Sequence, residues 1–255
     1  MSEGSADLRD GIAVVTGGTR GIGAAVVKRL VTNGQTVVAS YVRNEGAANE
    51  LAQSLADAAG TVHLVQADVA DEPDIIAMFE VADALGSVTS VVNNAGLIYP
   101  IGKLVDFDAD RIARTMAVNV TGLLLCCREA VRRMSTAGGG PGGAIVNVSS
   151  RAASFGSPND FIDYAASKGA VDTATIGLAT EVAAEGVRVN AVRPGLIDTE
   201  IHADAGFPDR AFALGGNIPM GRPGSADEVA ATIQWLLSDE SSYVTGALLD
   251  VGGGR

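Results

Sequence analysis

Short apolar stretches rich in valine and isoleucine alternate along this chain with longer amphipathic stretches rich in alanine. A continuous apolar run is typical of a parallel strand covered on both faces, and an amphipathic stretch is typical of a helix. The pattern predicts strands over 12–16, 36–42, 62–67, 88–93, 144–150, 187–193 and 247–251. It predicts helices over 21–33, 45–58, 72–85, 108–136, 161–184 and 225–238.

This alternation predicts the α/β class, with a doubly wound parallel sheet of about seven strands, right-handed crossovers and helices on both faces. No linker interrupts it, so we expect a single domain over 11–255 after a flexible tail over 1–10. Residues 194–224 hold several prolines and glycines, and so long a connection is typical of a substrate loop or lid. The glycine-rich stretch 138–143 is interpreted as a flexible connector rather than a phosphate loop, because no helix follows it.

The net charge and the lengths of the apolar runs exclude some classes of binding partner. Eighteen Lys and Arg stand against 30 Asp and Glu, a formal net charge of −12, which disfavours nucleic acid and anionic membrane surfaces. No apolar run is long enough to span a membrane, and the first residues lack the features of a secretory signal. The adjacent Cys126 and Cys127 are interpreted as small core residues in a reducing compartment. We therefore expect a cytoplasmic protein that binds neither nucleic acid nor membrane.

The first predicted strand runs into a glycine-rich turn, Thr16-Gly17-Gly18-Thr19-Arg20-Gly21-Ile22-Gly23, and then into a helix. Glycine lets the backbone turn tightly and approach a pyrophosphate, and the helix start offers unpaired N–H groups and the positive end of its dipole. A close-packed turn alone would also need glycine, but the position between strand and helix favours nucleotide binding. The spacing is T-G-x-x-x-G-x-G rather than G-x-G-x-x-G.

The end of the second predicted strand lacks the carboxylate that binds the ribose 2′-hydroxyl of NAD in dinucleotide folds. Tyr41 stands at that position, Arg43 follows two residues later, and Arg20 lies in the glycine turn. A carboxylate would repel a 2′-phosphate, whereas guanidinium groups pair with it. We therefore expect NADP(H) to be favoured over NAD(H), with Glu45 near enough in sequence to compete for the ribose.

A tyrosine and a lysine lie one helical turn apart in Tyr164-Ala165-Ala166-Ser167-Lys168. This spacing puts the phenol and the ammonium on one helix face, where the cation would lower the phenol pKa toward the range that suits acid–base catalysis. Such pairs also occur by chance on helix surfaces. Here Ser150 ends the fifth predicted strand, at the same sheet edge as the glycine turn, and Asn119 lies in the long predicted helix.

Together these motifs resemble the short-chain dehydrogenase/reductase family, over residues 11–252. The resemblance implies a Rossmann fold and a catalytic tetrad of Asn119, Ser150, Tyr164 and Lys168. Tyr164 would then be the general acid/base, and Ser150 would hydrogen-bond the carbonyl or alcohol oxygen. Lys168 would hold the nicotinamide ribose and lower the Tyr164 pKa, and Asn119 would anchor a proton-relaying water.

The third and fourth predicted strands end in segments that the resemblance assigns to the cofactor. Asp68, with Val69 beside it, would contact the adenine, because its carboxylate can accept from the amino group. Asn94 would satisfy backbone groups between adjacent strands, while the small Ala95 and Gly96 leave room for a ribose.

A Pro-Gly turn after the sixth predicted strand resembles the family's turn beside the cofactor carboxamide and phosphates; a rigid loop exit is the structural alternative. The expected cofactor-binding residues are Gly17, Thr19, Arg20, Gly21, Ile22, Gly23, Tyr41, Arg43, Asp68, Val69, Asn94, Ala95, Gly96, Tyr164, Lys168, Pro194, Gly195, Ile197 and Thr199.

Ser149 and Ser150 compete for the role of catalytic serine, because adjacent strand residues point to opposite faces. The family more often has twelve residues between the serine and the tyrosine, and counting from Ser150 gives thirteen. We choose Ser150, because Ser149 would require a second extra residue.

The predicted function is an NADP(H)-dependent oxidoreductase that interconverts a secondary alcohol and a ketone or aldehyde, similar to bacterial sugar dehydrogenases and 3-oxoacyl-carrier-protein reductases. One alternative is a non-catalytic dinucleotide-binding redox sensor, which would bind cofactor without turnover. Another is a methyltransferase on a similar sheet, in which the Tyr-Lys pair would have no role. Family members are commonly tetramers, and the small-residue faces at 117–127 and 165–179 and the stretch 244–250 predict a homotetramer.

Other residues receive minor roles or none. His63 and His202 have no second ligand at metal spacing, so no metal site is predicted. Asp160 and Asp163 are interpreted as caps of the helix that carries Tyr164, and Trp235 as a core or interface residue. Candidates for substrate contact are Ile98, Tyr99, Phe155, Phe161, His202 and Phe207.

Overall fold

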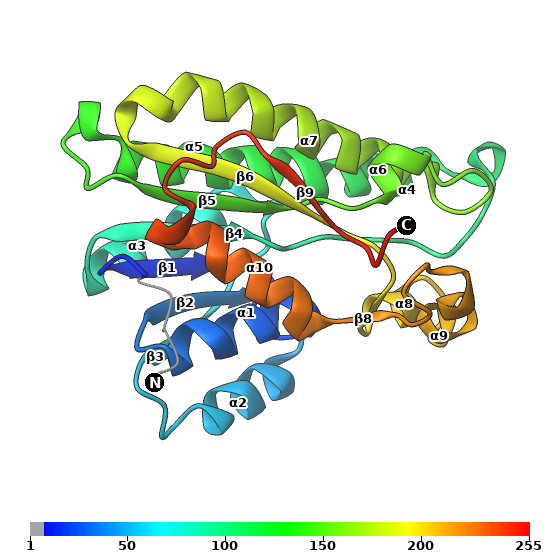
Figure 1. Cartoon of the computed structure of the whole chain (residues 1–255), viewed down its shortest axis with the longest axis horizontal. Coiled ribbons are helices and arrows are strands. Elements are labelled where there is room, and N and C mark those ends of the chain that lie inside the picture. The colour runs from blue at the N-terminus through cyan, green and yellow to red at the C-terminus, as the bar shows by residue number, and fades with distance from the viewer. Residues whose placement is uncertain (1–7) are drawn as a thin grey trace.

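Seven parallel strands form one sheet in the order β3-β2-β1-β4-β5-β6-β9 (Figure 1). The computed structural model describes residues 8–255, except the side chains of His202 and Asp204. Residues 1–7 of the expected tail and the His202 side chain, a candidate substrate contact, therefore lie outside the described part. The strands are β1 (Ile12–Val15), β2 (Thr36–Tyr41), β3 (Thr61–Gln66), β4 (Val88–Asn93), β5 (Gly143–Val148), β6 (Val187–Pro194) and β9 (Leu248–Val251).

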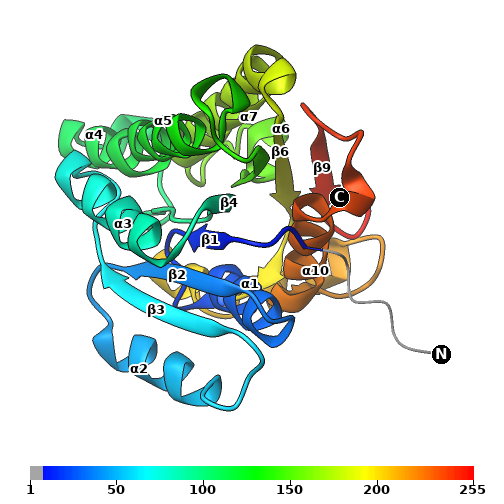
Figure 2. The ribbon, with the colours of Figure 1, turned by 90° about the vertical axis from the view of Figure 1, so that its left-hand side faces the viewer.

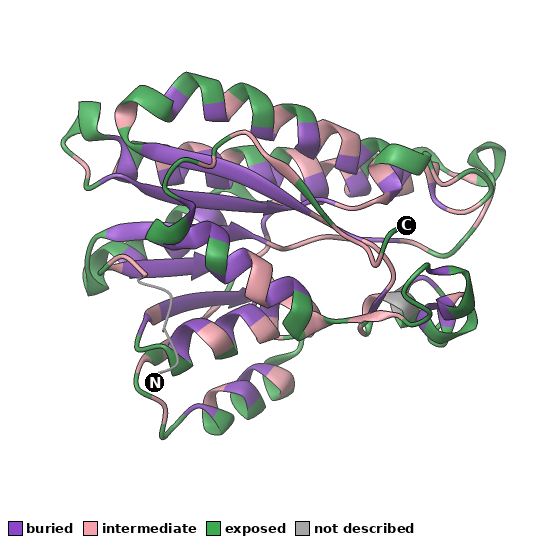
Figure 3. Cartoon of the chain, in the orientation of Figure 1, coloured by how far each residue is buried: buried purple, intermediate pink, exposed green. Residues whose placement is uncertain are grey.

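Helices cover both faces of the sheet, as Figures 1 and 2 show. Along β1, Ile12 and Val14 pack into one apolar cluster while Ala13 and Val15 pack into another, because successive side chains of a strand alternate between faces. The strands are buried throughout the middle of the sheet (Figure 3), which explains their continuous apolar runs. One face is covered by α1 (Gly21–Thr32), α2 (Glu45–Ser54) and α10 (Ala226–Leu237), and the other by α3 (Glu72–Leu85), α5 (Leu123–Met134) and α7 (Ile162–Val182).

The strand order reverses between β1 and β4, which pair side by side in the middle of the sheet. In open α/β sheets, ligands bind beyond the carboxyl ends of the strands at such a switch point. The glycine turn after β1 and the Asn94 segment after β4 leave the sheet at this point. The predicted fold class is confirmed, including the seven strands and the helices on both faces.

The long predicted helix over 108–136 contains an irregular segment. It consists of α4 (Ala109–Met116), a π-helical segment (Ala117–Gly122) and α5. A Cβ on Gly122 would lie 2.2 Å from the Val69 carbonyl oxygen, so this turn packs directly on the backbone after β3. Asn119 lies within the π-helical segment, an irregularity that often marks functional positions.

The connection over 194–224 contains short elements that the prediction lacked. They are β7 (Ile197–Asp198) and β8 (Gly224–Ser225), which pair in parallel, with α8 (Ile201–Asp204) and α9 (Arg210–Ala213) between them. A short helix, α6 (Ala152–Phe155), follows β5. In contrast, the glycine-rich stretch 138–143 leads into β5, whose first residue is Gly143, and so lies at the amino end of that strand, as a connector would.

Other predictions concern burial. Cys126 and Cys127 are buried on α5 without a disulfide, as predicted, whereas Trp235 is partly exposed on α10, which excludes the core interpretation. None of the helices within residues 8–255 combines the length and apolar character needed to cross a membrane.

Candidate active site

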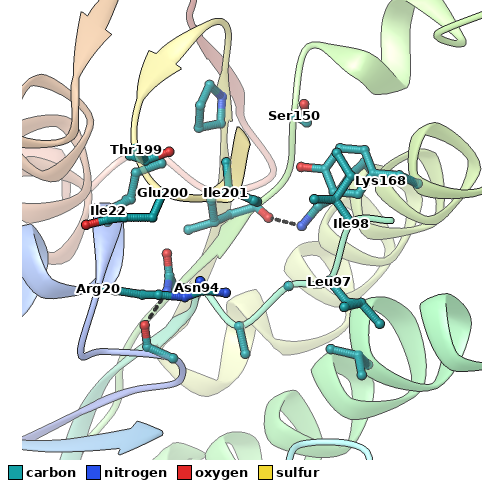
Figure 4. Close-up of a pocket in the computed structure, with 18 of the residues that line it drawn as sticks. Arg20, Ile22, Asn94, Leu97, Ile98, Ser150, Lys168, Thr199, Glu200 and Ile201 are labelled. Atoms are coloured by element: carbon teal, nitrogen blue, oxygen red, sulfur yellow. Dashed lines mark hydrogen bonds between the residues drawn. The ribbon is translucent and has the colours of Figure 1, made fainter. Parts of the chain in front are cut away.

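A cavity of about 750 Å³ lies at the carboxyl edge of the sheet. Ser150 and every residue expected to bind cofactor line it, with the exception of Gly23. Ile98, Tyr99, Phe155 and Phe161 also line it, whereas Phe207 does not. Figure 4 shows Arg20 and Asn94 on one side of the cavity, with Ser150, Ile98 and Lys168 on the other.

The glycine turn after β1 depends on backbone conformations that favour glycine. Gly17 and Gly21 have φ angles of +61° and +52°, and both line the cavity. Helix α1 begins after Arg20 without a side-chain cap, and Gly21 and Ile22 of its first turn line the cavity. Gly23 has a packing role instead, because a Cβ there would lie 2.2 Å from the Gly17 carbonyl oxygen.

Asn94 ties the end of β4 to the glycine turn, as predicted. Its Nδ2 donates to the Thr16 carbonyl oxygen at 3.0 Å and to the Gly17 carbonyl oxygen at 2.9 Å. The Thr16 hydroxyl in turn accepts from the backbone N–H groups of Asn94 and Ala95. These hydrogen bonds fix the segment after β1 against the segment after β4, the two strands between which the strand order reverses.

Three charged residues meet near the ends of β2 and β3. Arg114 of α4 donates to the Asp68 carboxylate, and the Ala70 N–H donates to the same side chain. Burial alone would raise the Asp68 pKa, but the Ala70 bond, Arg114 and nearby Arg43 together hold it below its ordinary value. Arg114 lines the cavity and was missed from the sequence, because nothing in the helical pattern shows which residue it will face.

Tyr164 and Lys168 lie on the same face of α7, with Ser150 opposite. Burial raises the pKa of the Tyr164 phenol to about 12, and a hydrogen bond with Ser150 offsets part of this rise. Burial lowers the pKa of the Lys168 ammonium to about 8, although the negative charge of Asp172 raises it in part. The Lys168 Nζ donates to the Val148 carbonyl oxygen at 2.7 Å and lies 5.5 Å from the Tyr164 ring centre.

The expectation that Lys168 lowers the Tyr164 pKa is therefore wrong for this structure. Desolvation of the phenol dominates, and the ammonium is directed to a backbone carbonyl rather than to the phenol oxygen. The phenol is consequently protonated at neutral pH.

The two candidate serines have different partners. The Ser149 hydroxyl is buried and donates to the Lys168 carbonyl oxygen at 3.1 Å. The Ser150 hydroxyl interacts with Tyr164 and accepts from the Ala152 N–H at 3.1 Å. This arrangement favours Ser150 as the hydroxyl that faces a ligand.

Asn119 does not line the cavity but supports its wall. Its side chain accepts from the Leu97 N–H at 2.7 Å and donates to the Leu97 carbonyl oxygen at 2.9 Å and to the Ser167 hydroxyl at 3.0 Å. Gly96 lies between this amide and Lys168, since a Cβ on it would be 3.8 Å and 3.6 Å from their respective Oδ1 and Nζ atoms.

The predicted caps of α7 are wrong. Helix α7 follows Phe161 without a side-chain cap, and both aspartates bind arginines instead. Asp163 is buried, and its carboxylate accepts a hydrogen bond from the Nε of Arg111 at 2.7 Å. The Asp160 carboxylate accepts a hydrogen bond from the Nη2 of Arg210 at 2.6 Å. The two arginines come from α4 and α9, so only the tertiary structure shows these pairings.

Comparison with known proteins places these features in a family. A family model described as Enoyl-(Acyl carrier protein) reductase matches residues 17–255. A solved structure, a short-chain dehydrogenase/reductase from Serratia marcescens BCRC 10948, superposes with a TM-score of 0.86 at 34% identity, over 97% of this chain and 98% of that one. This chain belongs to the short-chain dehydrogenase/reductase family.

Three relatives are similar to this chain over almost their whole length. The uncharacterized oxidoreductase YgfF of Escherichia coli (strain K12) is 51% identical, over 96% of this chain and 99% of that protein. The cis-4-hydroxycyclohexanecarboxylate dehydrogenase of Sinomonas cyclohexanicum is 41% identical, over 95% of each. The 3beta-hydroxysteroid dehydrogenase 1 of Eggerthella lenta is 39% identical, over 97% and 94%.

Short-chain dehydrogenases/reductases are oxidoreductases that use NAD(H) or NADP(H), and this cavity fits such a dinucleotide. Gly17 and Gly21 of the glycine turn line the cavity at the start of α1, and a Cβ on Gly17 would lie 3.1 Å from the Ala95 Cα. Arg20, Arg43 and Arg114 line the same end, where a cofactor carries its phosphates.

Proposed function

We propose that this short-chain dehydrogenase/reductase is an NADP(H)-dependent enzyme that interconverts a secondary alcohol and a ketone or aldehyde. The observation that carries the proposal is the meeting of Ser150, Tyr164 and Lys168 in one cavity with the open glycine turn. Two relatives support the substrate chemistry, since their names describe dehydrogenases of a hydroxysteroid and of a hydroxycyclohexanecarboxylate.

The proposed mechanism assigns the proton to Tyr164 and the hydride to the cofactor, which exchanges it with the carbonyl carbon. The phenol, with a pKa of about 12, carries its proton at neutral pH, and we assign to it the proton that the carbonyl oxygen receives during reduction. Ser150 donates a hydrogen bond to the same oxygen and orients it. Lys168 would hold the nicotinamide ribose, and Asn119 fixes the Leu97 backbone and would anchor a proton-relaying water.

The cofactor would lie from the glycine turn to Tyr164. Gly17, Thr19, Gly21 and Ile22 would hold the phosphates, with Asp68 and Val69 near the adenine. The remaining proposed contacts are Arg20, Tyr41, Arg43, Asn94, Ala95, Gly96, Lys168, Pro194, Gly195, Ile197 and Thr199.

The preference for NADP(H) rests on the residues that follow β2. Tyr41 and Arg43 line the cavity, whereas Glu45 does not and instead begins α2. Arg43→Ala is expected to raise the KM for NADPH by about 10-fold or more and to change the KM for NADH little, because one charge-assisted contact to a 2′-phosphate is lost. Steady-state kinetics with both cofactors checks this. A wild-type enzyme that favours NADH would contradict it.

The assignment of Ser150 predicts different results for two adjacent alanine variants. Ser150→Ala should lower kcat by about 100-fold, because a hydrogen bond to the reacting oxygen is lost. Ser149→Ala removes only a buried bond to the Lys168 carbonyl oxygen and should lower the free energy of unfolding by about 1 kcal/mol. Kinetics and thermal unfolding of both variants test the assignment, and the reverse order of kcat values would refute it.

A panel of sugars, steroids, acyl thioesters and small cyclic ketones with NADPH tests the function itself. Oxidation of NADPH by a ketone is the expected result. Cofactor binding without turnover of any compound would favour the redox-sensor alternative. S-adenosylmethionine binding by calorimetry would favour the methyltransferase.

We also propose that residues 11–255 act as a single domain in a cytoplasmic homotetramer and that the loop over 194–224 selects the substrate. Leu124 of α5 and Ile176 of α7 are about half exposed on the two long helices, which supports packing against other copies. Tyr243, before β9, and Leu249, within it, are exposed as well. Light scattering checks the tetramer.

A further inference from the structure

Beside Tyr164 the cavity has an apolar wall next to a buried guanidinium, while Arg151 and Arg255 stack on Phe155 elsewhere in its lining. Ile98, Phe161 and Ile201 belong to an apolar cluster there, and Arg210 of α9 lines the same space although only 9% of it is exposed. The Arg210 guanidinium carbon lies 5.1 Å from the Phe161 ring centre, and that ring meets the Tyr164 ring edge-on at 5.7 Å between centres. The Phe161 ring therefore contacts both the guanidinium and the Tyr164 ring.

The Arg210 guanidinium has N–H donors that Asp160 does not use. Within the described part of the chain, Asp160 is the one hydrogen-bond partner of this side chain, and it binds Nη2 alone. Asp160 does not line the cavity. Because a guanidinium carries five N–H donors in a planar fork, Nη1 and Nε can still donate to a carboxylate.

The charges around the cavity also favour an anionic ligand. Among the described residues that line it, the only carboxylate side chains are Asp68 and Glu200, although the whole chain has a net charge of −12. Asp68 is paired with Arg114, and Glu200 lies beside the Gly21 end of the glycine turn. The lining cations are Arg20, Arg43, Arg114, Arg151, Lys168, Arg210 and Arg255.

The cofactor phosphates account for the arginines near the glycine turn but not for Arg210. Its guanidinium contacts Phe161, which packs against Tyr164, whereas Arg20 belongs to the glycine turn and Arg43 and Arg114 lie near Asp68. A cation in an apolar, enclosed space attracts an anionic group more strongly than one in water. Asp160 already neutralises part of the charge, which suits a singly charged carboxylate better than a phosphate dianion.

We propose that Arg210 recognises a carboxylate on the substrate, held at the far end of an apolar body whose hydroxyl or carbonyl group meets Tyr164. This inference rests on the proposed function and names the substrate class of the same site. Since Arg210 belongs to the 194–224 loop, the bound carboxylate also fastens that loop over the substrate.

The test compares two ketones that differ only in charge, 4-oxocyclohexanecarboxylate and 4-oxocyclohexanecarboxamide, with NADPH as reductant. The wild type should prefer the acid by about 10- to 100-fold in kcat/KM, the effect of hydrogen bonds to a charged group. In Arg210→Met the ratio should fall to about one. Arg210→Lys, which keeps the charge but loses the fork, should give an intermediate ratio.

The matched control is Arg222→Met. Arg222 lies in the same loop and pairs with Glu228, but it does not line the cavity, so the ratio should stay at the wild-type value. If Arg210 serves only to hold the loop through Asp160, its loss will lower kcat/KM equally for both ketones. An equal loss would overturn the proposal.

Calorimetry provides a readout that needs no turnover. Cyclohexanecarboxylate should bind the NADPH-loaded wild type more tightly than cyclohexanecarboxamide does, and Arg210→Met should lose this difference. Equal binding of the acid and the amide by the wild type would overturn the carboxylate site. Failure of every alcohol and ketone to react would instead overturn the proposed function, while the calorimetric comparison would still decide the role of Arg210.

Discussion

Replacement of Tyr164 by phenylalanine is expected to lower kcat for ketone reduction by about 10²- to 10⁴-fold, the usual contribution of a positioned proton donor. Phenylalanine keeps the ring that packs edge-on against Phe161 but has no proton to donate. NADPH binding should therefore remain close to that of the wild type. Stopped-flow or steady-state kinetics measures the first effect, and fluorescence titration of NADPH measures the second.

Tyr243→Phe is the matched control for this variant. Tyr243 is fully exposed and lies outside the cavity, so removal of its hydroxyl should leave kcat unchanged. A Tyr164→Phe enzyme with wild-type kcat would refute the proposed proton donor. A variant that also lost NADPH binding would show that the phenol supports the cofactor site rather than the proton step.

Replacement of Lys168 by methionine is expected to make the enzyme nearly inactive and at the same time more stable near neutral pH. Activity should fall by about 100-fold or more, because the proposed hold on the cofactor ribose is lost. Stability should rise because the folded protein buries an ammonium whose pKa is lowered to about 8. An increase of about 1–2 kcal/mol in the free energy of unfolding at pH 7 is expected, after allowance for the lost bond to the Val148 carbonyl oxygen.

The pH dependence distinguishes this effect from a general change in packing. Below about pH 8 the lysine is charged in both states, so the full desolvation cost opposes folding. Between about pH 8 and the unfolded value of 10.5, the folded protein loses the proton first, and the wild type gains stability as the pH rises. The difference between Lys168→Met and wild type should therefore shrink across this range.

Denaturant unfolding at pH 7 and at pH 10 measures that difference. Lys28→Met is the control, because Lys28 is exposed on α1 and its replacement should change neither stability nor kcat. A Lys168→Met protein less stable than wild type at pH 7 would contradict the expected cost of the buried ammonium.

Much of the site could be predicted because its parts are local in the chain. The turn from β1 into α1 needs glycine at two positions of positive φ, and these stand within a few residues of each other. The four-residue spacing of Tyr164 and Lys168 is enough to place them on one face of α7. The end of each parallel strand is a local feature, and all these ends meet at one edge of the sheet.

The features that were missed all depend on partners distant in sequence. Arg114 and Arg210 are ordinary helical residues until the fold brings them to Asp68 and Asp160. The capping interpretation of Asp160 and Asp163 failed for the same reason, because their carboxylates accept hydrogen bonds from arginines of other elements. The π-helical turn at Asn119 depends on the close approach of Gly122 to the backbone after β3.

By itself, the sequence determined the alternation of strands and helices, the edge of the sheet at which the cavity lies, and most of the residues that were expected to line it. Apolar periodicity, glycine conformation and helical spacing are local properties, and they suffice for this. Only the tertiary structure decided how burial shifts the pKa values of Tyr164 and Lys168, and that Arg210 lines the cavity. These depend on how many atoms replace water around a charged group, which is settled only when distant segments pack together.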